Sequence, residues 1–254
     1  MRGVSLVEVH PGDRKGTDTD IDIIAVHGLD TKSPDTWIWR SNNPDDSGVN
    51  WLANEEMLPK RVGRARIFTC DWPANLLQES TSIRKTMKEF ARLLLAGIQN
   101  MRIKYMKQPG ATENRPILFI ASCLGGIILM EALVIADHDQ SDYISLRRAT
   151  GGIVFLATPF RGTAFQDVAN WAVPVLKARA SLQHQVVTTL LDSVKGPTAD
   201  LTERVGGFTR MCQDRHHPCR VFNFYEGEKT ILQRKVFPSW LANLFYQGKP
   251  VSFI

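Results

Sequence analysis

The residues best suited to chemistry lie in the stretch 116–133, where an apolar run meets small residues and then a helical pattern. A buried strand that turns sharply into a helix has this pattern, and the side chain at the tip of the turn stands above the sheet. The amides at the start of such a helix point at the same place. The sequence therefore predicts a nucleophile site at this turn, with Cys123 at its tip.

Spacing selects Cys123 over the adjacent serine. A nucleophile elbow needs small residues two positions before and two after its tip, because the strand and the helix come close there. For Cys123 these positions hold Ala121 and Gly125. For Ser122 they would hold two bulky aliphatic residues, so Ser122 is not the expected nucleophile. Gly126 further allows the next strand to approach the helix.

A cysteine at this position can act as a nucleophile. A helix N-terminus stabilises a thiolate, and a histidine partner would do so further. Attack on an ester would then give a thioester intermediate. The alternative is an inert Cys123 in a turn that is kept only for folding.

The elements that would position this turn alternate along the chain. Apolar strands are expected at 5–9, 20–26, 66–71, 116–121, 151–157, 220–225 and 250–254. Helices are expected at 50–58, 81–106, after Cys123, across 161–214 and at 240–246. Continuous apolar strands that alternate with helices predict a mostly parallel sheet covered on both faces. We expect a single α/β domain over 1–254, with an N-terminal extension at 1–18 and a helical insertion, a candidate lid, at 161–214.

A second signal follows the strand at 20–26, which ends in His27-Gly28-Leu29. In α/β-hydrolases an amide in the loop after this strand donates one oxyanion hydrogen bond, and the residue after the nucleophile donates the other. The expected donors are the backbone N–H groups of Leu29 and Leu124. His27 itself is expected to be structural rather than a catalytic base.

Several motifs, in order, resemble one branch of the α/β-hydrolase superfamily. The resemblance covers about residues 18–254. Its motifs are His27-Gly28-Leu29, Asp35-Thr36-Trp37, Asn50-Trp51-Leu52, Met57-Leu58-Pro59, Ala121-Ser122-Cys123-Leu124-Gly125-Gly126 and Phe155-Leu156-Ala157-Thr158-Pro159-Phe160-Arg161-Gly162. The branch comprises the serine-active-site-containing proteins of mitochondria and endoplasmic reticulum and DUF676-like lipases, related to GPI inositol-deacylases. Its fungal members stand alone or form N-terminal modules of NOD-like receptors.

The resemblance implies the α/β-hydrolase fold and hydrolysis of ester or thioester bonds, most plausibly in lipids. It matches Glu226 to the family's catalytic acid. The chain departs from the family at the elbow, where Ala121, Ser122 and Cys123 replace Gly-His-Ser, and at Phe160, which replaces a histidine.

The family's catalytic histidine lies after the last strand, within which this sequence ends at Ile254. The histidines at 10, 138, 184, 216 and 217 are not expected to replace it. Two explanations stay open. One is a fragment of a longer hydrolase, and the other is an inactive domain that binds a ligand or partner, such as the N-terminal module of a signalling receptor.

The composition of the chain limits the classes of partner and the location that we expect. The 31 basic and 26 acidic residues are interspersed, so we expect no nucleic-acid surface, and the cluster at 60–66 is read as a solvated face. No signal peptide or membrane-spanning run is visible, which predicts an intracellular protein with reduced cysteines. By resemblance, it would contact mitochondrial or endoplasmic-reticulum membranes peripherally. No cofactor is expected. The ligands between Cys212 and Cys219 are too closely spaced to favour zinc.

Overall fold

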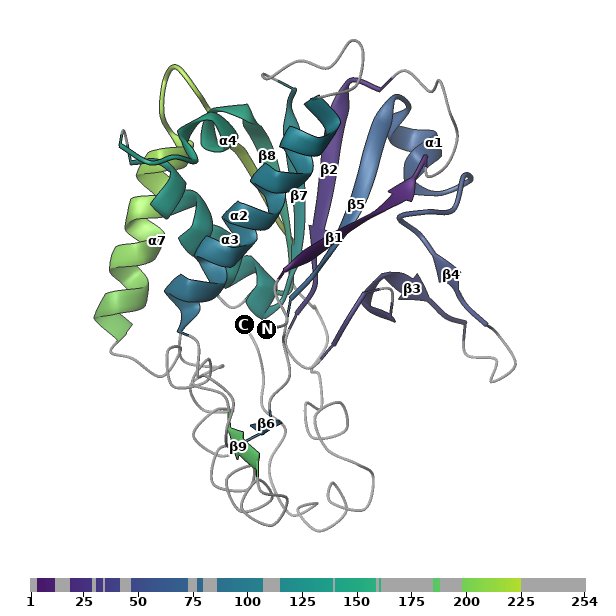
Figure 1. Cartoon of the computed structure of the whole chain (residues 1–254), viewed down its shortest axis with the longest axis horizontal. Helices are drawn as coiled ribbons and strands as arrows, with labels where there is room; N and C mark the ends of the chain where they lie inside the picture. The colour runs from purple at the N-terminus through teal and green to yellow at the C-terminus, as the bar shows by residue number, and fades with distance from the viewer. Residues whose placement is uncertain are drawn as a thin grey trace.

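The computed structural model describes residues 4–11, 19–28, 31–33, 35–41, 47–72, 77–79, 86–106, 115–138, 140–158, 160, 185–187 and 198–224. Within these residues six strands form the central sheet, in the order β1-β5-β2-β7-β8-β10. They are β1 (Ser5–His10), β2 (Ile21–Val26), β5 (Ala65–Asp71), β7 (Ile117–Ser122), β8 (Thr150–Leu156) and β10 (Arg220–Phe224). Figure 1 shows them side by side, with β1 crossing at one edge.

The sheet is parallel apart from β1, which pairs antiparallel with β5. All seven predicted strands except 250–254, which lies outside the described residues, are therefore present. The central strand β2 is buried over nearly its whole length. Both faces of a parallel sheet are covered, so its central strands are apolar at consecutive positions, as at 23–26, rather than at alternate ones.

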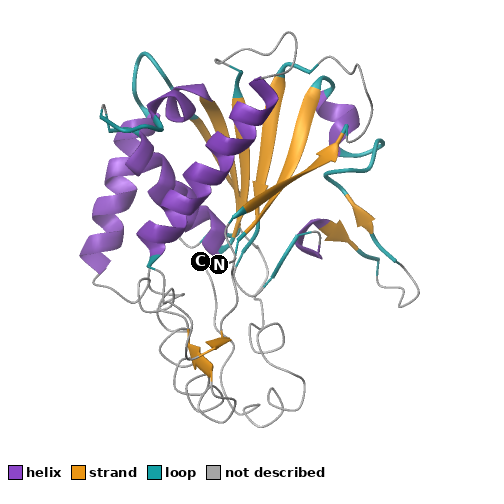
Figure 2. Ribbon diagram, in the orientation of Figure 1, coloured by secondary structure: helices purple, strands orange, loops and turns teal. Residues whose placement is uncertain are grey.

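Helices cover one face of the sheet in particular (Figures 1 and 2). This face packs against α2 (Met87–Met106), α3 (Leu124–Ala136), α4 (Ile144–Ala149) and α7 (Thr198–Cys212). The opposite face buries Ile23 and Ala25 of β2 against Trp37 and Leu52, with α1 (Leu58–Val62) packed alongside. The fold is the expected α/β arrangement, with helices on both faces.

The long amphipathic helix predicted at 81–106 is confirmed as α2, with residues 81–85 outside the described part. A capping box starts it: Glu89 Oε2 accepts from the backbone N–H of Thr86 at 2.6 Å, and Thr86 Oγ1 accepts from the N–H of Glu89 at 3.3 Å. This reciprocal pair satisfies two amides that have no partner within the helix. The buried positions of α2 recur at helical spacing and face α3 and the sheet.

The helix predicted at 50–58 is wrong. Residues 51–53 and 55–57 form turns, and α1 begins only at Leu58, with Pro59 in its first turn. Pro59 does not end a helix here, because a proline in the first turn of a helix loses no intrahelical hydrogen bond and has the right φ. The polar stretch before it contains a short 3₁₀ turn, η1 (Asp35–Trp37), and a small hairpin of β3 (Ile38–Trp39) and β4 (Val49–Asn50).

The stretch expected to be helical throughout 161–214 is only partly so. Its last part is α7, but β9 (Gln185–Val187) pairs antiparallel with β6 (Leu77–Glu79), a strand that was not predicted. The helical prediction is therefore wrong at 185–187. Residues 161–184 and 188–197, with the predicted helix at 240–246, lie outside the described residues, so the lid stays a prediction.

One residue of the basic cluster is buried rather than solvated. Arg66 Nε and Nη2 donate to the two oxygens of the fully buried Asp22, at 2.8 and 3.1 Å. Arg115 Nε donates to the same carboxylate at 2.8 Å, and Arg102 lies 3.7 Å from it. Three cations thus compensate one buried carboxylate near the amino end of β2. The interpretation of 60–66 as a solvated face is wrong for Arg66.

Candidate functional site

Cys123 occupies the turn between β7 and α3, as the spacing predicts. Its backbone has φ 51° and ψ −129°, a conformation that side-chain-bearing residues rarely adopt. The Cys123 N–H donates to Leu156 O of β8 at 2.9 Å, and the Gly126 N–H donates to Cys123 O at 3.1 Å. Strain of this kind persists only where the surroundings hold it, and it concentrates at functional sites. Cys123 is half-buried, and Leu124, the first residue of α3, is fully buried.

The small residues around the turn have the roles that the elbow pattern assigns. A Cβ at Gly125 would lie 3.0 Å from His27 C and from Val26 O, and still closer to His27 O. A Cβ at Gly126 would lie 2.7 Å from Thr158 Cγ2. Ala121 is fully buried in β7, opposite Val26 of β2. Larger residues would push α3 away from the strands on either side.

The chain after β2 comes up against the turn directly. A Cβ on Gly28 would lie 2.9 Å from Cys123 Cβ and 3.7 Å from Cys123 Sγ. The loop expected to carry the first oxyanion donor therefore begins beside the thiol. Leu29, the expected donor, lies outside the described residues, whereas Leu124 stands where the second donor was predicted. The close approach of Gly28 was not anticipated, although a glycine directly after a buried strand is the signal that would have indicated it.

His27 is a structural residue, as expected. It is fully buried, stacks on Trp72 with ring centroids 5.6 Å apart, and accepts from the Trp72 N–H at Nε2 (3.3 Å). Its Nδ1 donates to Gly28 O at 2.9 Å, and the Trp72 indole donates to His27 O at 2.9 Å. Burial lowers the pKa of His27 despite the nearby Asp71 carboxylate, so the ring is neutral. The pair His27–Trp72 holds the strand end against which Gly125 packs.

Two neighbouring strands end at the same edge. After β8, Ala157 has φ 52°, and its N–H donates to Phe224 O, the last residue of β10, at 2.7 Å. Phe160 packs edge-on against Phe155 with centroids 4.8 Å apart. Glu226, the predicted acid, follows β10 by two residues and lies outside the described residues.

The other described histidines are remote from this edge by position in the fold. His10 is the last residue of the outer strand β1, and its Nδ1 lies 3.8 Å from Glu55 Oε1. His138 follows the far end of α3, and His216 and His217 lie in the loop before β10 begins. The remaining candidate, His184, lies outside the described residues.

Trp37 and Trp39 lie in different environments. Trp37 is 1% exposed, packs edge-on against Trp51 and donates to Ser33 Oγ at 3.1 Å, so it belongs to the core. Trp39 is exposed. All four cysteines are thiols. In the part of the chain that the structure describes, no three His, Cys, Asp or Glu side chains are grouped as metal ligands, and no helix is long and apolar enough to cross a membrane.

Comparisons with known proteins found the following similarities. No family model matches the chain. Protein SERAC1 of Danio rerio is 28% identical over 248 residues, 93% of this chain, and the chain spans only 35% of that protein. A metagenomic carboxyl esterase is similar over 85% of this chain and 54% of its own, with 17% identity and a TM-score of 0.44. An esterase of Pyrococcus furiosus is similar over 89% of this chain and 79% of its own, with 13% identity and a TM-score of 0.45. The parallel sheet, its covering helices and the strained turn after β7 give the chain the α/β-hydrolase fold.

Proposed function

We propose that this chain is an ester or thioester hydrolase in which Cys123 is the nucleophile. The observation that carries the proposal is the strained turn at Cys123, enclosed by Gly28, Gly125 and the end of β8. Two other segments, the chain after β2 and the end of β8, meet the turn that carries the half-buried thiol, at the carboxyl edge of a parallel sheet. Ligands of open α/β sheets bind at this edge, beyond the strand ends.

The chemistry follows from the orientation of the turn. The Cys123 thiolate attacks the carbonyl carbon of the substrate, and the carbonyl oxygen becomes an oxyanion. The backbone N–H groups of Leu124 and Leu29 donate to that oxygen, and the positive end of α3 adds to its stabilisation. Collapse of the intermediate expels the alcohol or thiol and leaves an acyl group on the Cys123 sulfur, which water then hydrolyses.

The remaining roles come from the family resemblance. Glu226 would orient a general base, and in the related hydrolases that base is a histidine from a loop after the last strand. The β10 strand, which precedes Glu226, ends at the same edge as the elbow through the hydrogen bond between Ala157 and Phe224. This arrangement supports the assignment of Glu226 as the acid.

The resemblance to lipases also suggests the substrate class. We propose that acyl chains of lipids are the substrates and that the protein meets them at a membrane surface, in mitochondria or the endoplasmic reticulum if it follows the family. The zebrafish relative supports the same branch, and fungal members of the branch would link the domain to signalling modules.

One observation favours a non-catalytic domain instead. In the family a histidine follows the Thr-Pro pair, whereas here Phe160 stands at that position and packs edge to face against Phe155, so that polar group is absent. A domain that retained the pocket but lost its base would bind an acyl ligand or a partner without turning it over.

One experiment distinguishes the hydrolase from the non-catalytic binding domain. The purified protein is incubated with p-nitrophenyl esters and acyl thioesters of short and long chain, and nitrophenol release, thiol release and intact mass are recorded. A hydrolase is expected to release product and to gain one acyl group on Cys123. Cys123→Ala should abolish both signals, whereas the matched control Ser122→Ala should retain them. If the native protein and the Cys123→Ala variant were acylated equally and neither turned over substrate, the hydrolase hypothesis would be refuted and the binding-domain hypothesis would remain.

A further inference from the structure

Two cysteines away from the elbow lie next to each other, in a segment that the proposed hydrolase does not use. Cys212 is the last residue of α7, and Cys219 immediately precedes β10. The Cys219 N–H donates to Cys212 O at 3.0 Å. With standard bond lengths, this hydrogen bond brings the two Cα atoms within about 7 Å, the upper limit for a disulfide.

The side chains of Cys212 and Cys219 are also hydrogen-bonded to each other. The loop between them is already ordered by Asp214, whose Oδ1 accepts the N–H groups of His216 at 2.8 Å and His217 at 2.7 Å. Bond formation therefore requires little movement of the backbone.

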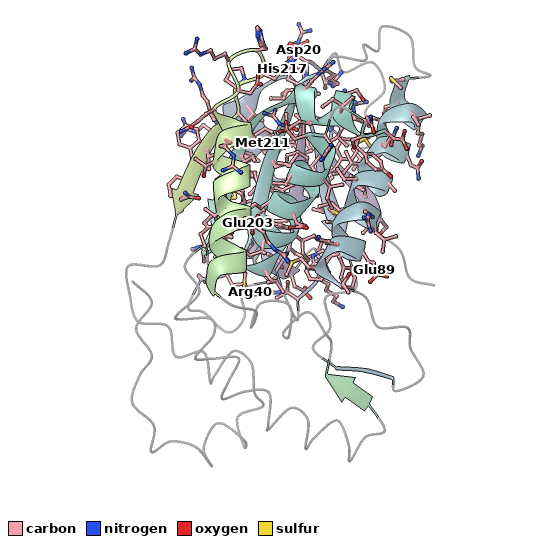
Figure 3. The ribbon with its side chains drawn as sticks, turned by 90° about the vertical axis from the view of Figure 1, so that its left-hand side faces the viewer. Asp20, Arg40, Glu89, Glu203, Met211 and His217 are labelled. Carbon is pink, nitrogen blue, oxygen red and sulfur yellow. The ribbon has the colours of Figure 1, made fainter. Side chains whose placement is uncertain are left out.

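A buried cation stands beside the pair. Arg147 of α4 is 1% exposed and donates through Nη2 to Met211 O at 2.5 Å and to His217 O at 3.0 Å, one on each arm of the loop. Figure 3 shows Met211 and His217 at the same end of α7. The hydrogen bond from Cys212 and the charge of Arg147 lower the pKa of Cys219, while the pKa of Cys212 is raised because it keeps the shared proton. Cys219, which is buried, is thus the more acidic thiol of the pair, and Cys212 is the proton donor.

We propose that Cys212 and Cys219 form a redox-active dithiol that hydroperoxides convert to an intramolecular disulfide. The Cys219 thiolate attacks one peroxide oxygen and breaks the O–O bond, giving Cys219 sulfenic acid and, after protonation of the departing oxygen, water or an alcohol. The Cys212 sulfur then attacks the sulfenic sulfur, the S–S bond forms, and the hydroxyl group leaves as water with the Cys212 proton. The two sulfurs lose two electrons, and the peroxide gains them.

The disulfide would tie the end of α7 to the start of β10. Arg147 also links this end of α7 to the end of α3. Its Nε lies 3.1 Å from Oδ1 of Asp137, the residue that caps α3. Oxidation therefore locks the connection between α7 and the strand that leads to Glu226. The site stands on these contacts and is independent of the proposed hydrolase.

The chain is well suited to a direct test. Trypsin cleaves after Arg210, Arg215 and Arg220, so each cysteine falls on its own peptide, 211–215 and 216–220. The native protein is treated with hydrogen peroxide, alkylated with N-ethylmaleimide and digested. We expect the two peptides to appear joined, lighter by two hydrogen atoms, and to separate on reduction. The proposal would be overturned if both peptides were alkylated after oxidant treatment, or if they were disulfide-linked to other chains.

Single-cysteine variants distinguish the attacking thiol, Cys219, from the resolving thiol, Cys212. Dimedone, which traps sulfenic acids, should label Cys219 in Cys212→Ser. In Cys219→Ser it should label Cys212 more slowly, because burial and the Asp137 carboxylate still raise the pKa of that thiol. Equal or reversed rates would overturn the assignment. Cys123→Ala serves as the matched control and should form the disulfide as the native protein does. If a serine variant does not fold, peptide mapping of the native protein still decides.

Discussion

Gly125→Ala is the most direct test of the elbow. The added Cβ would fall 3.0 Å from His27 C and Val26 O, and well within that distance of His27 O. All three atoms belong to the backbone at the end of β2, a strand held by parallel partners on both sides. No side-chain rotation can relieve the overlap, so either α3 or the end of β2 must shift.

The magnitude follows from two opposing effects. Alanine is favoured over glycine inside a helix by about 0.5–1 kcal/mol. Overpacking a close contact costs about 1–3 kcal/mol, and a rigid backbone neighbour puts this case at the upper end. The net result is a loss of about 2 kcal/mol. For a chain of this size, that corresponds to a melting temperature lower by about 4–8 °C.

The same displacement should reduce activity. Gly28 lies against Cys123, and a shift of the backbone before it moves the proposed oxyanion loop relative to the sulfur. Misplacement of a reacting group by about 1 Å can cost 10²-fold in rate. We therefore expect about a hundredfold lower ester hydrolysis by Gly125→Ala, measured at a temperature where the variant is folded.

Two further glycines provide the matched series. At Gly206 of α7, a Cβ would meet nothing closer than Arg210 Nη1 at 3.7 Å, so Gly206→Ala should stabilise the protein. At Gly126, the overlap is with the Thr158 and Phe155 side chains, which can partly move, so Gly126→Ala should fall between the other two. Thermal and urea unfolding rank the three variants. A Gly125→Ala protein as stable as Gly206→Ala would refute the elbow packing.

Three other substitutions test separate parts of the fold by urea unfolding. Asp22→Asn removes the buried carboxylate shared by three arginines and should cost about 3–5 kcal/mol; a loss below about 1 kcal/mol would contradict its burial. Burial lowers the pKa of His27 from 6.5, so below that pH the unfolded chain binds the proton more readily. Stability should therefore fall as pH drops through 6.5 and level off below the folded pKa, and His27→Asn should flatten this dependence; an unchanged slope would contradict it. Thr86→Ala opens the capping box with Glu89 and should cost about 1 kcal/mol, and no change in the midpoint would show that the box adds nothing.

The sheet could be predicted because its strands are buried on both faces. Runs such as 23–26 are apolar at successive positions, which is typical of a strand that is buried on both faces. The small strands β6 and β9 could not be predicted in this way. Each has three residues, too few to establish a period, and they pair across more than a hundred residues of sequence. The helix predicted before Pro59 was wrong for a different reason. A proline is compatible with the first turn of a helix as well as with the position after its end.

At the site, local spacing located the turn but not the contacts that hold it. The pattern from Ala121 to Gly126 is contained in one segment and fixes which residue is at the tip. The stacking of His27 on Trp72 and the approach of Gly28 to Cys123 depend on where two other strands end. These positions follow from the order of strands in the sheet, which hydrophobic pattern alone does not determine.

The contacts that form the turn also explain how a cysteine can occupy it. The close approaches involve the glycines at 28, 125 and 126, and two hydrogen bonds of the turn, to Leu156 O and from the Gly126 N–H, use the Cys123 backbone. Neither these close approaches nor these two hydrogen bonds require sulfur. Cys123→Ser should therefore keep the turn and the melting temperature, so any change in its rate of acylation reports the chemistry of the nucleophile alone. A large loss of stability in Cys123→Ser would show instead that the thiol helps to hold the fold.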